Sequence, residues 1–86
     1  MAIRRFNSDE ARLVGDRLGI DWSNVDLEQF RLGLGVEQEH GRVDPDTDVT
    51  HDDPVVTGRI ALAHLNEIPD YYTRLEHMEK EAMGKA

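Results

Sequence analysis

Apolar side chains recur along the chain at the three- and four-residue spacings of amphipathic helices, and the first half contains two such segments. The first begins at Asn7 or Ser8 and ends before Gly19. The second begins after Asp26, a preferred N-cap residue, and ends at Gly41. No segment alternates with the period of two that is typical of strands. The pattern therefore predicts an all-α fold.

Proline and aspartate mark the helix ends in the second half. Asp53 followed by Pro54 fits an N-cap and a first helical residue, and the third helix then ends before Pro69. Asp70 caps a fourth helix that runs to the carboxyl terminus. Between the second and third helices, residues 42–52 are polar, rich in turn-forming residues and without helical period. This stretch predicts an irregular loop.

The third segment is apolar almost all round, and only Arg59 and Asn66 form a polar strip on it. A helix of this kind is covered by its neighbours, so we expect it to be the central helix of a small four-helix domain. In the connector before the second helix, Trp22 is expected to cover the core. Within the second helix, Gly33 and Gly35 predict the close approach of another backbone or of a bulky side chain.

Length and charge limit the classes of protein. The chain has 86 residues, which predicts a single domain over 1–86 with a thin core. Its formal charge is −8, from 18 acidic and 10 basic residues, which argues against direct binding to nucleic acid. No long apolar run or leader-like stretch is present, so we expect a cytoplasmic protein without a membrane partner. Because there is no cysteine, a metal would need histidine and carboxylate ligands.

Two histidine–carboxylate pairs provide the candidate chemistry. Glu37 and His40 lie three residues apart on the second helix, as do His64 and Glu67 on the third. At 100° per residue all four side chains point toward the apolar side of their helices. Such a set would suit Zn, Mn or Fe in a helical bundle. The alternative is a structural role, in which each histidine donates a hydrogen bond to a buried carboxylate.

The direction of the third helix decides whether the two pairs meet. If the second and third helices are antiparallel, the pairs are expected to lie about 20 Å apart at 1.5 Å per residue. Glu37 and His40 would then lie near His51, Asp52 and Asp53 instead. If residues 42–52 carry the chain back along the bundle, or if a homodimer forms, the two pairs can share one ion.

Other chemistry is less favoured. Asp44, Asp46 and Asp48 alternate as in a calcium-binding loop, but Val49 stands in place of the required glycine and Val55 in place of the final glutamate. Solvated turn aspartates are the preferred interpretation. No nucleophile motif and no phosphate-binding loop is present. A histidine with a buried carboxylate could act as a general base, but no substrate pocket can be recognised, so an enzyme is the third choice.

Several short motifs resemble a small domain family of unknown function from bacterial and bacteriophage genomes. They cover most of the chain and are most specific in its second half. The motifs are GIDW at 19–22, DLEQFR at 26–31, EHG at 39–41, VTHDDP at 49–54 and TGRIALAHLNEIPDYYTRL at 57–75. The resemblance implies a phage or mobile-element context, and it assigns no catalytic residue.

Two functional hypotheses follow. The first is a non-enzymatic binding module whose inward pairs hold a divalent metal or form a polar network that fixes the bundle. The second, based on the −8 charge and short length, is an acidic interaction protein, an inhibitor or adaptor encoded by a phage or mobile element. It would engage the basic surface of a protein partner, and its histidine–glutamate pairs would be purely structural.

Overall fold

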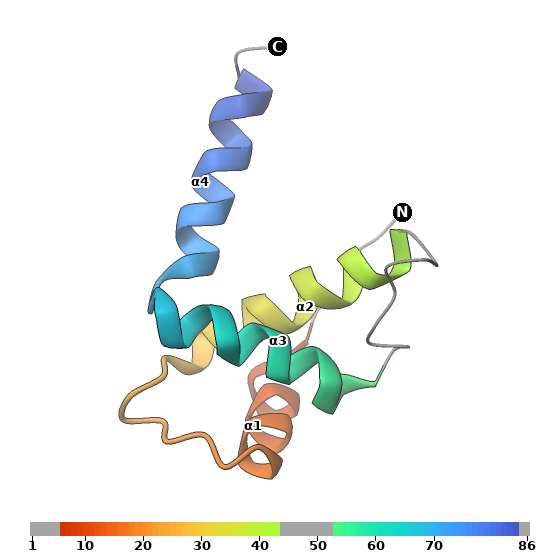
Figure 1. Cartoon of the computed structure of the whole chain (residues 1–86), viewed down its shortest axis with the longest axis vertical. Helices are drawn as coiled ribbons and strands as arrows, with labels where there is room; N and C mark the ends of the chain where they lie inside the picture. Colours follow the sequence, from red (N-terminus) through yellow and green to blue (C-terminus); the bar gives the residue numbers. More distant parts are fainter. Residues whose placement is uncertain (1–5, 44–52, 85–86) are drawn as a thin grey trace.

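The computed structural model describes residues 6–43 and 53–84, with side chains as far as residue 39 in the first range. Within these residues the chain forms four α-helices and no strand, so the predicted all-α class is confirmed (Figure 1). None of the helices in these two ranges is long and apolar enough to span a membrane. The helices are α1 (Ser8–Arg17), α2 (Leu27–Val43), α3 (Pro54–Glu67) and α4 (Tyr71–Gly84).

Local hydrogen bonds define both ends of helix α1. At its start, the Asn7 side chain accepts a hydrogen bond from the Glu10 amide at 2.8 Å, and the Glu10 carboxylate accepts one from the Asn7 amide at 3.0 Å. At its end, Gly19 adopts a positive φ of 73°, which glycine reaches without steric cost. This turn lets the Ile20 amide donate to the Gly15 carbonyl at 2.9 Å. The chain therefore reverses immediately after α1.

Helix α3 begins and ends where the sequence predicts. The Asp53 carboxylate accepts a hydrogen bond from the Val55 amide at 2.9 Å, and Pro54 is the first helical residue. Ile68 is extended because the ring of Pro69 disfavours a helical conformation in the residue before it. A short corner then leads into α4.

Helix α2 continues to Val43, past the predicted stop at Gly41. Glycine lowers helix stability by about 1 kcal/mol without ending a helix by itself. The first two residues of the expected 42–52 loop are therefore helical. The rest of that loop, residues 44–52, lies outside the described residues.

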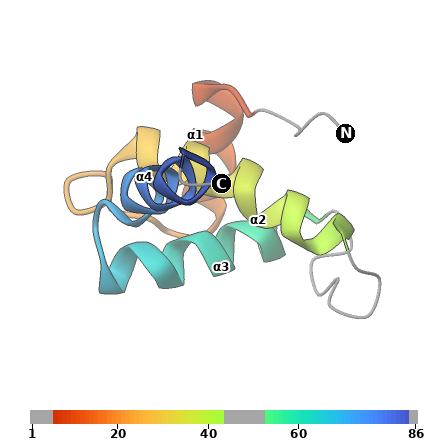
Figure 2. The ribbon, with the colours of Figure 1, turned by 90° about the horizontal axis from the view of Figure 1, so that it is seen from above.

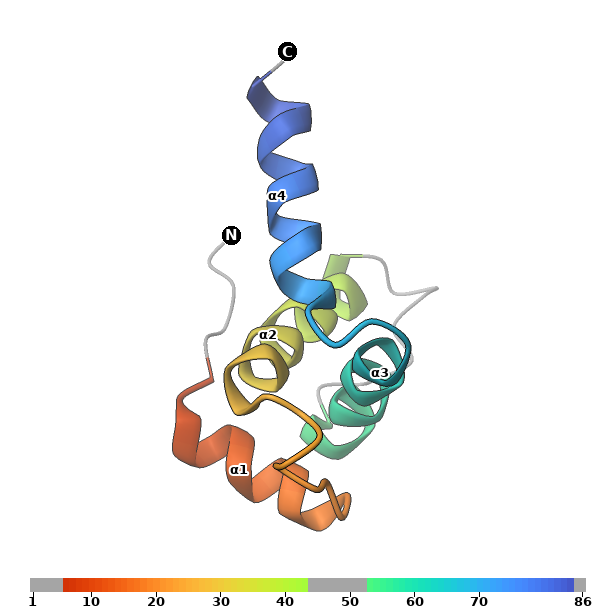
Figure 3. The same cartoon turned by 90° about the vertical axis from the view of Figure 1, so that its left-hand side faces the viewer.

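Helix α2 contacts each of the other three helices. Helices α2 and α3 lie side by side and run in opposite directions, and α1 lies along one side of the pair (Figures 1 and 3). Helix α3, which the sequence places at the centre, packs against α1 and α2 and touches the first turn of α4 through His64. It leaves Arg59, Ala63 and Asn66 exposed. Alanine is apolar enough to look internal in a pattern, yet its small surface costs little when exposed to water.

The core lies where α1, α2 and α3 meet, and the first turn of α4 closes it. Trp22 covers one side, as predicted: its ring meets Phe30 edge-on at 5.7 Å and occupies the space above Gly15. Its indole nitrogen donates to the Asp16 carboxylate at 2.9 Å. The buried apolar residues are Phe6, Ala11, Phe30, Leu34, Ala61, Leu65 and Tyr72.

Tyr72 fills the space left by the missing side chain of Gly33. A Cβ atom at Gly33 would lie 2.5 Å from Tyr72 Cε2 and 3.0 Å from the Ala61 Cβ. This confirms the expectation that a bulky side chain approaches the second helix at a glycine. The contact joins α2, α3 and α4 at one point.

Replacing Gly33 with alanine should destabilise the domain by about 1–3 kcal/mol. The gain of about 1 kcal/mol in helix propensity is outweighed, because the Tyr72 ring must move out of its packed position. Denaturant unfolding measures the change. Gly84→Ala is the control, because a Cβ atom there meets nothing within 4 Å. The control should be neutral or more stable, and equal effects at the two sites would contradict the packing assigned to Gly33.

Candidate functional site: a buried tyrosine–glutamate–histidine network

Tyr72, from the first turn of α4, connects a carboxylate on α2 with an imidazole on α3. Its hydroxyl donates a hydrogen bond to Glu37 Oε2 at 2.8 Å. Nδ1 of His64 lies 3.1 Å from the same hydroxyl and 3.1 Å from Glu37 Oε2. Glu37 and Tyr72 are buried, whereas 35% of the His64 side chain is exposed. Three helices thus meet in one polar cluster that reaches the surface only at the histidine.

The contacts of the Tyr72 hydroxyl and of Glu37 indicate the tautomer of His64. The Tyr72 proton is directed to the carboxylate, so it is not available to Nδ1 of His64. A lone pair on Nδ1 would face the Glu37 oxygen at 3.1 Å and be repelled. Nδ1 therefore carries a proton and donates toward Glu37. In the neutral imidazole the free lone pair is then on Nε2.

Burial raises the pKa of the Tyr72 hydroxyl well above its ordinary value, and the negative charge and hydrogen bond of Glu37 raise it further. The phenol remains protonated because a phenolate would be a second negative charge beside the carboxylate. Tyr72 is therefore a permanent donor to Glu37 rather than an acid that gives up its proton.

The exposed part of His64 is covered on one side by Tyr71. The two rings stack with centroids 4.4 Å apart and an angle of 22°. Nε2 has no hydrogen-bond partner among the residues that the structure describes. His64 is thus an oriented imidazole with a stacked aromatic neighbour and a buried carboxylate behind it.

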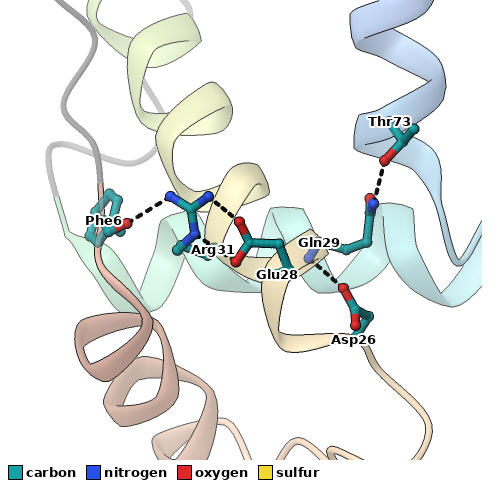
Figure 4. A network of polar contacts seen from close by, with 6 residues as sticks. All are labelled: Phe6, Asp26, Glu28, Gln29, Arg31 and Thr73. Carbon is teal, nitrogen blue, oxygen red and sulfur yellow. Dashed lines mark hydrogen bonds and ion pairs between the residues drawn. The ribbon is translucent and has the colours of Figure 1, made fainter.

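A second polar contact attaches α4 to α2 at the side chain of Gln29 (Figure 4). Its amide nitrogen donates to the Thr73 hydroxyl at 2.5 Å, and its amide oxygen accepts from the Tyr72 backbone at 3.2 Å. The latter satisfies an amide in the first turn of α4 that has no partner within the helix. Gln29 is held in place because its own backbone amide donates to Asp26 at 3.0 Å.

Figure 4 also shows how Phe6, two residues before the start of α1, is attached to α2. The Arg31 guanidinium donates to the Phe6 carbonyl at 3.1 Å and pairs with the Glu28 carboxylate. The hydrogen bond to Arg31 lowers the pKa of Glu28. These contacts lie around the start of α2, on the other side of the helix from Thr73.

The structure joins one half of each predicted pair. Glu37 and His64 meet, whereas Glu67 is exposed, so the expectation that Glu67 is buried was wrong. Glu67 is the last residue of α3, where no neighbouring helix covers it. The side chain of His40 lies outside the described part of the chain.

Of the remaining candidates, the structure describes only Asp53, which does not join this cluster. Asp53 is exposed and caps α3 through the Val55 amide. His51 and Asp52 lie outside the described residues, as do the aspartates at 44, 46 and 48. Among the residues that are described, no three histidine or acidic side chains come close enough to hold a metal ion.

The distance of about 20 Å estimated from the sequence implied that antiparallel helices would keep Glu37 away from His64. In the structure the two side chains meet although the helices are antiparallel. That distance counted residues along the helix axes and ignored the lengths of the side chains. Both side chains lean toward the amino-terminal ends of their own helices, and in antiparallel helices these directions converge. The gap above Gly33 then admits the Tyr72 ring beside them.

Tyr72 and Gln29 are the residues that sequence reasoning missed. Tyr72 appears in the sequence as one of two adjacent aromatic residues, and Gln29 as a partner of the Asp26 cap. The glycine at position 33, inside a helix, was the available signal, because it predicts a large neighbour without identifying it.

The described residues thus form a small all-α domain with a buried network at the joint of its last helix. The family model described as "Protein of unknown function (DUF5661)" matches residues 11–81, and the chain belongs to this family. The resemblance to a domain family of unknown function is therefore confirmed. No curated protein and no solved structure matches the chain.

Tyr72→Phe should lower the free energy of unfolding by about 1–3 kcal/mol, because it removes a hydrogen bond from a buried carboxylate. Tyr71→Phe is the matched control, since it keeps the ring that stacks on His64. It should cost less than about 0.5 kcal/mol. Equal effects of the two substitutions would contradict the role assigned to the Tyr72 hydroxyl.

The stability of the same two variants should also differ at alkaline pH. The pKa of Tyr72 is raised in the folded state from an ordinary value of 10.0, so its contribution to stability is complete below pH 10 and is lost as the pH rises further. Above pH 10 the wild type and Tyr71→Phe should lose stability more steeply than Tyr72→Phe, by up to about 1.4 kcal/mol per pH unit. Parallel curves would contradict the buried, protonated state.

Proposed function

We propose that this domain is a protein-interaction module that presents the outer part of α4 as its binding surface. The observation that carries the proposal is the exposure of this segment. Every residue of 76–84, which we call the α4 arm, is exposed. Helix α4 extends away from the other three helices (Figures 1 and 3), and Figure 2 shows it nearly end-on. Met78 is 59% exposed and Met83 is 77% exposed.

An isolated helical arm gains little stability from its own chain. Helices shorter than about 12–15 residues are marginal in water, and most helical stability in proteins comes from packing of an apolar face. Methionine adapts its shape to varied partners and is frequent at binding surfaces of this kind. A partner that covered Met78 would thus also stabilise the α4 arm.

The base of α4 supplies the rigidity that a presented helix needs. Tyr72 binds Glu37 and fills the gap above Gly33, while Gln29 binds two groups of the first turn of α4. These contacts fix the direction in which the α4 arm leaves the body. In this proposal the tyrosine–glutamate–histidine network is structural, and it orients the binding surface rather than forming it.

Met78→Glu should abolish binding through the α4 arm, because it places a charge at the centre of the apolar face. His77→Glu introduces the same side chain at a neighbouring exposed position on the opposite face and should leave binding intact. The measurement is capture of binding proteins on immobilised wild type and both variants, at low and at high salt. Equal recovery on all three proteins would contradict the proposal, as would partners retained by a chain ending at residue 75.

A metal remains the second candidate, because His64 presents an oriented imidazole whose Nε2 has no partner among the described residues. A carboxylate that accepts from Nδ1 is a common second contact of a metal-bound histidine. Among the described residues, however, no three histidine or acidic side chains come close enough to hold a metal ion. The structural network is therefore the preferred role for this cluster.

Metal analysis of protein purified without a histidine tag separates the two roles of His64. We expect a stoichiometry far below one for Zn, Mn and Fe, and no change in melting temperature when each is added. His64→Gln should then behave as the wild type toward metals. A stoichiometry near one that His64→Gln abolishes would replace the structural role with a metal site.

A further inference from the structure

We infer that the α4 arm pairs with an amphipathic helix of a different protein, one whose apolar stripe is flanked on both sides by lysine or arginine. The inference rests on the proposed function and names the chemistry of the partner. Three features of α4 support it: the residues that flank the apolar face of the arm, the positions of the nearby basic residues, and the charge at the carboxyl end of the helix.

Glutamates flank the apolar face of the α4 arm on both sides. Met78 and Ala82 lie about one helical turn apart on the same face, and both are exposed. At 100° per residue, Glu79 lies on one side of these two residues and Glu81 lies on the other. In a pair of packed helices, the residues at these flanking positions meet those of the partner helix and determine which partner is accepted. The apolar face thus has a negative charge along each edge.

The basic residues of α4 do not compensate these two glutamates. Lys80 lies on the opposite side of the helix, where its Nζ pairs with the Glu76 carboxylate at 3.1 Å. Arg74 shares an edge with Glu81 but lies two turns closer to the body, and its guanidinium pairs with the Asp70 carboxylate at 2.6 Å. Both cations of α4 therefore already have acidic partners within the chain.

The carboxyl end of α4 adds a further negative charge. The helix dipole places a partial negative charge there, which basic residues in the last turn usually offset. The last turn of α4 contains no basic residue. A basic partner would thus interact favourably with the end of the helix as well as with the two glutamates.

The same charges disfavour a second copy of this chain. If two copies pair through Met78 and Ala82, the antiparallel orientation sets Glu81 against Glu81, and the parallel orientation sets Glu79 against Glu81. The formal charge of −8 on each chain adds to this repulsion. A helix with basic residues on both flanks meets opposite charges in either orientation.

The contact is small, so binding should be weak and should require both the apolar contact and the charges. A seam of about two helical turns buries less than the 1,200 Å² or so that marks the lower limit of stable interfaces. We expect a dissociation constant between about 10 µM and 1 mM.

Two designed helical peptides test the inference in titrations of the full chain at low salt. Each has about three heptads with leucine along one stripe, and the flanking positions are all lysine in one peptide and all glutamate in the other. The basic peptide should bind, and added salt should weaken its binding, whereas the acidic peptide should not bind. No binding of the basic peptide up to about 1 mM would overturn the inference.

Met78→Glu distinguishes a specific contact from general attraction between a basic peptide and an acidic chain. The substitution adds a negative charge, yet it should weaken binding of the basic peptide about tenfold or more, because the apolar contact is lost. His77→Glu adds the same charge on the other side of the helix and should bind as the wild type does. Equal or tighter binding to Met78→Glu would show that only the total charge matters and would overturn the inference.

Exchanging the flanking charges tests their role directly. A chain with both Glu79→Lys and Glu81→Lys should lose the basic peptide and bind the acidic one, although the chain as a whole stays acidic. Glu76→Gln is the control, because this residue lies away from the apolar face, and it should retain the preference of the wild type. An unchanged preference in the double variant would overturn the assignment of basic flanks to the partner.

Failure of the inference can be told from failure of the proposed function. A protein that the chain captures in a Met78-dependent way, and that the double variant with Glu79→Lys and Glu81→Lys still captures, overturns the basic flanks alone. The absence of Met78-dependent binding to any peptide or protein overturns both. Circular dichroism of each variant shows whether its helices remain folded.

Discussion

The arrangement of this domain depends on one aromatic ring and its hydroxyl group. Tyr72 enters the space above Gly33, where any larger residue would collide with it, and donates its proton to the buried carboxylate of Glu37. The carboxylate needs that donor, because a buried charge without hydrogen bonds is strongly unfavourable. The ring, in turn, needs the glycine. Neither contact belongs to the three-helix body alone, and together they determine where α4 begins and in which direction it runs.

This joint divides the molecule into a packed body and an exposed arm. Helix α2 lies at the centre of the body and supplies Gln29, Gly33 and Glu37, which form one side of the joint at successive turns. Beyond Leu75 the helix has no packing partner within the described residues, although its apolar stripe continues. A fixed base with an uncovered outer face is consistent with a surface that another chain completes. In the proposed function the network fixes the direction of the α4 arm, and the α4 arm provides the binding surface.

Much of the fold could be predicted because local rules control the helix ends. Asn7 and Asp53 cap helices through their own side chains, and Pro69 limits the residue before it. The interior direction of Glu37 also follows from its position on α2. Burial of Glu67 could not be judged in this way, because helical position shows which side a residue faces but not how far the neighbouring helix extends. Tyr72, which connects Glu37 with His64, lies 35 residues from Glu37 in the sequence, and no local pattern specifies this tertiary contact.

The account is tested most directly by a double-mutant cycle between Glu37 and Tyr72, with Glu37→Met, Tyr72→Phe and the double variant compared by denaturant unfolding. If the hydroxyl and the carboxylate depend on each other, the double variant should lose less unfolding free energy than the two single variants lose in sum, by about 1–3 kcal/mol. Additive effects, within about 0.3–0.5 kcal/mol, would show that the two residues act independently and would contradict the joint on which the structure depends.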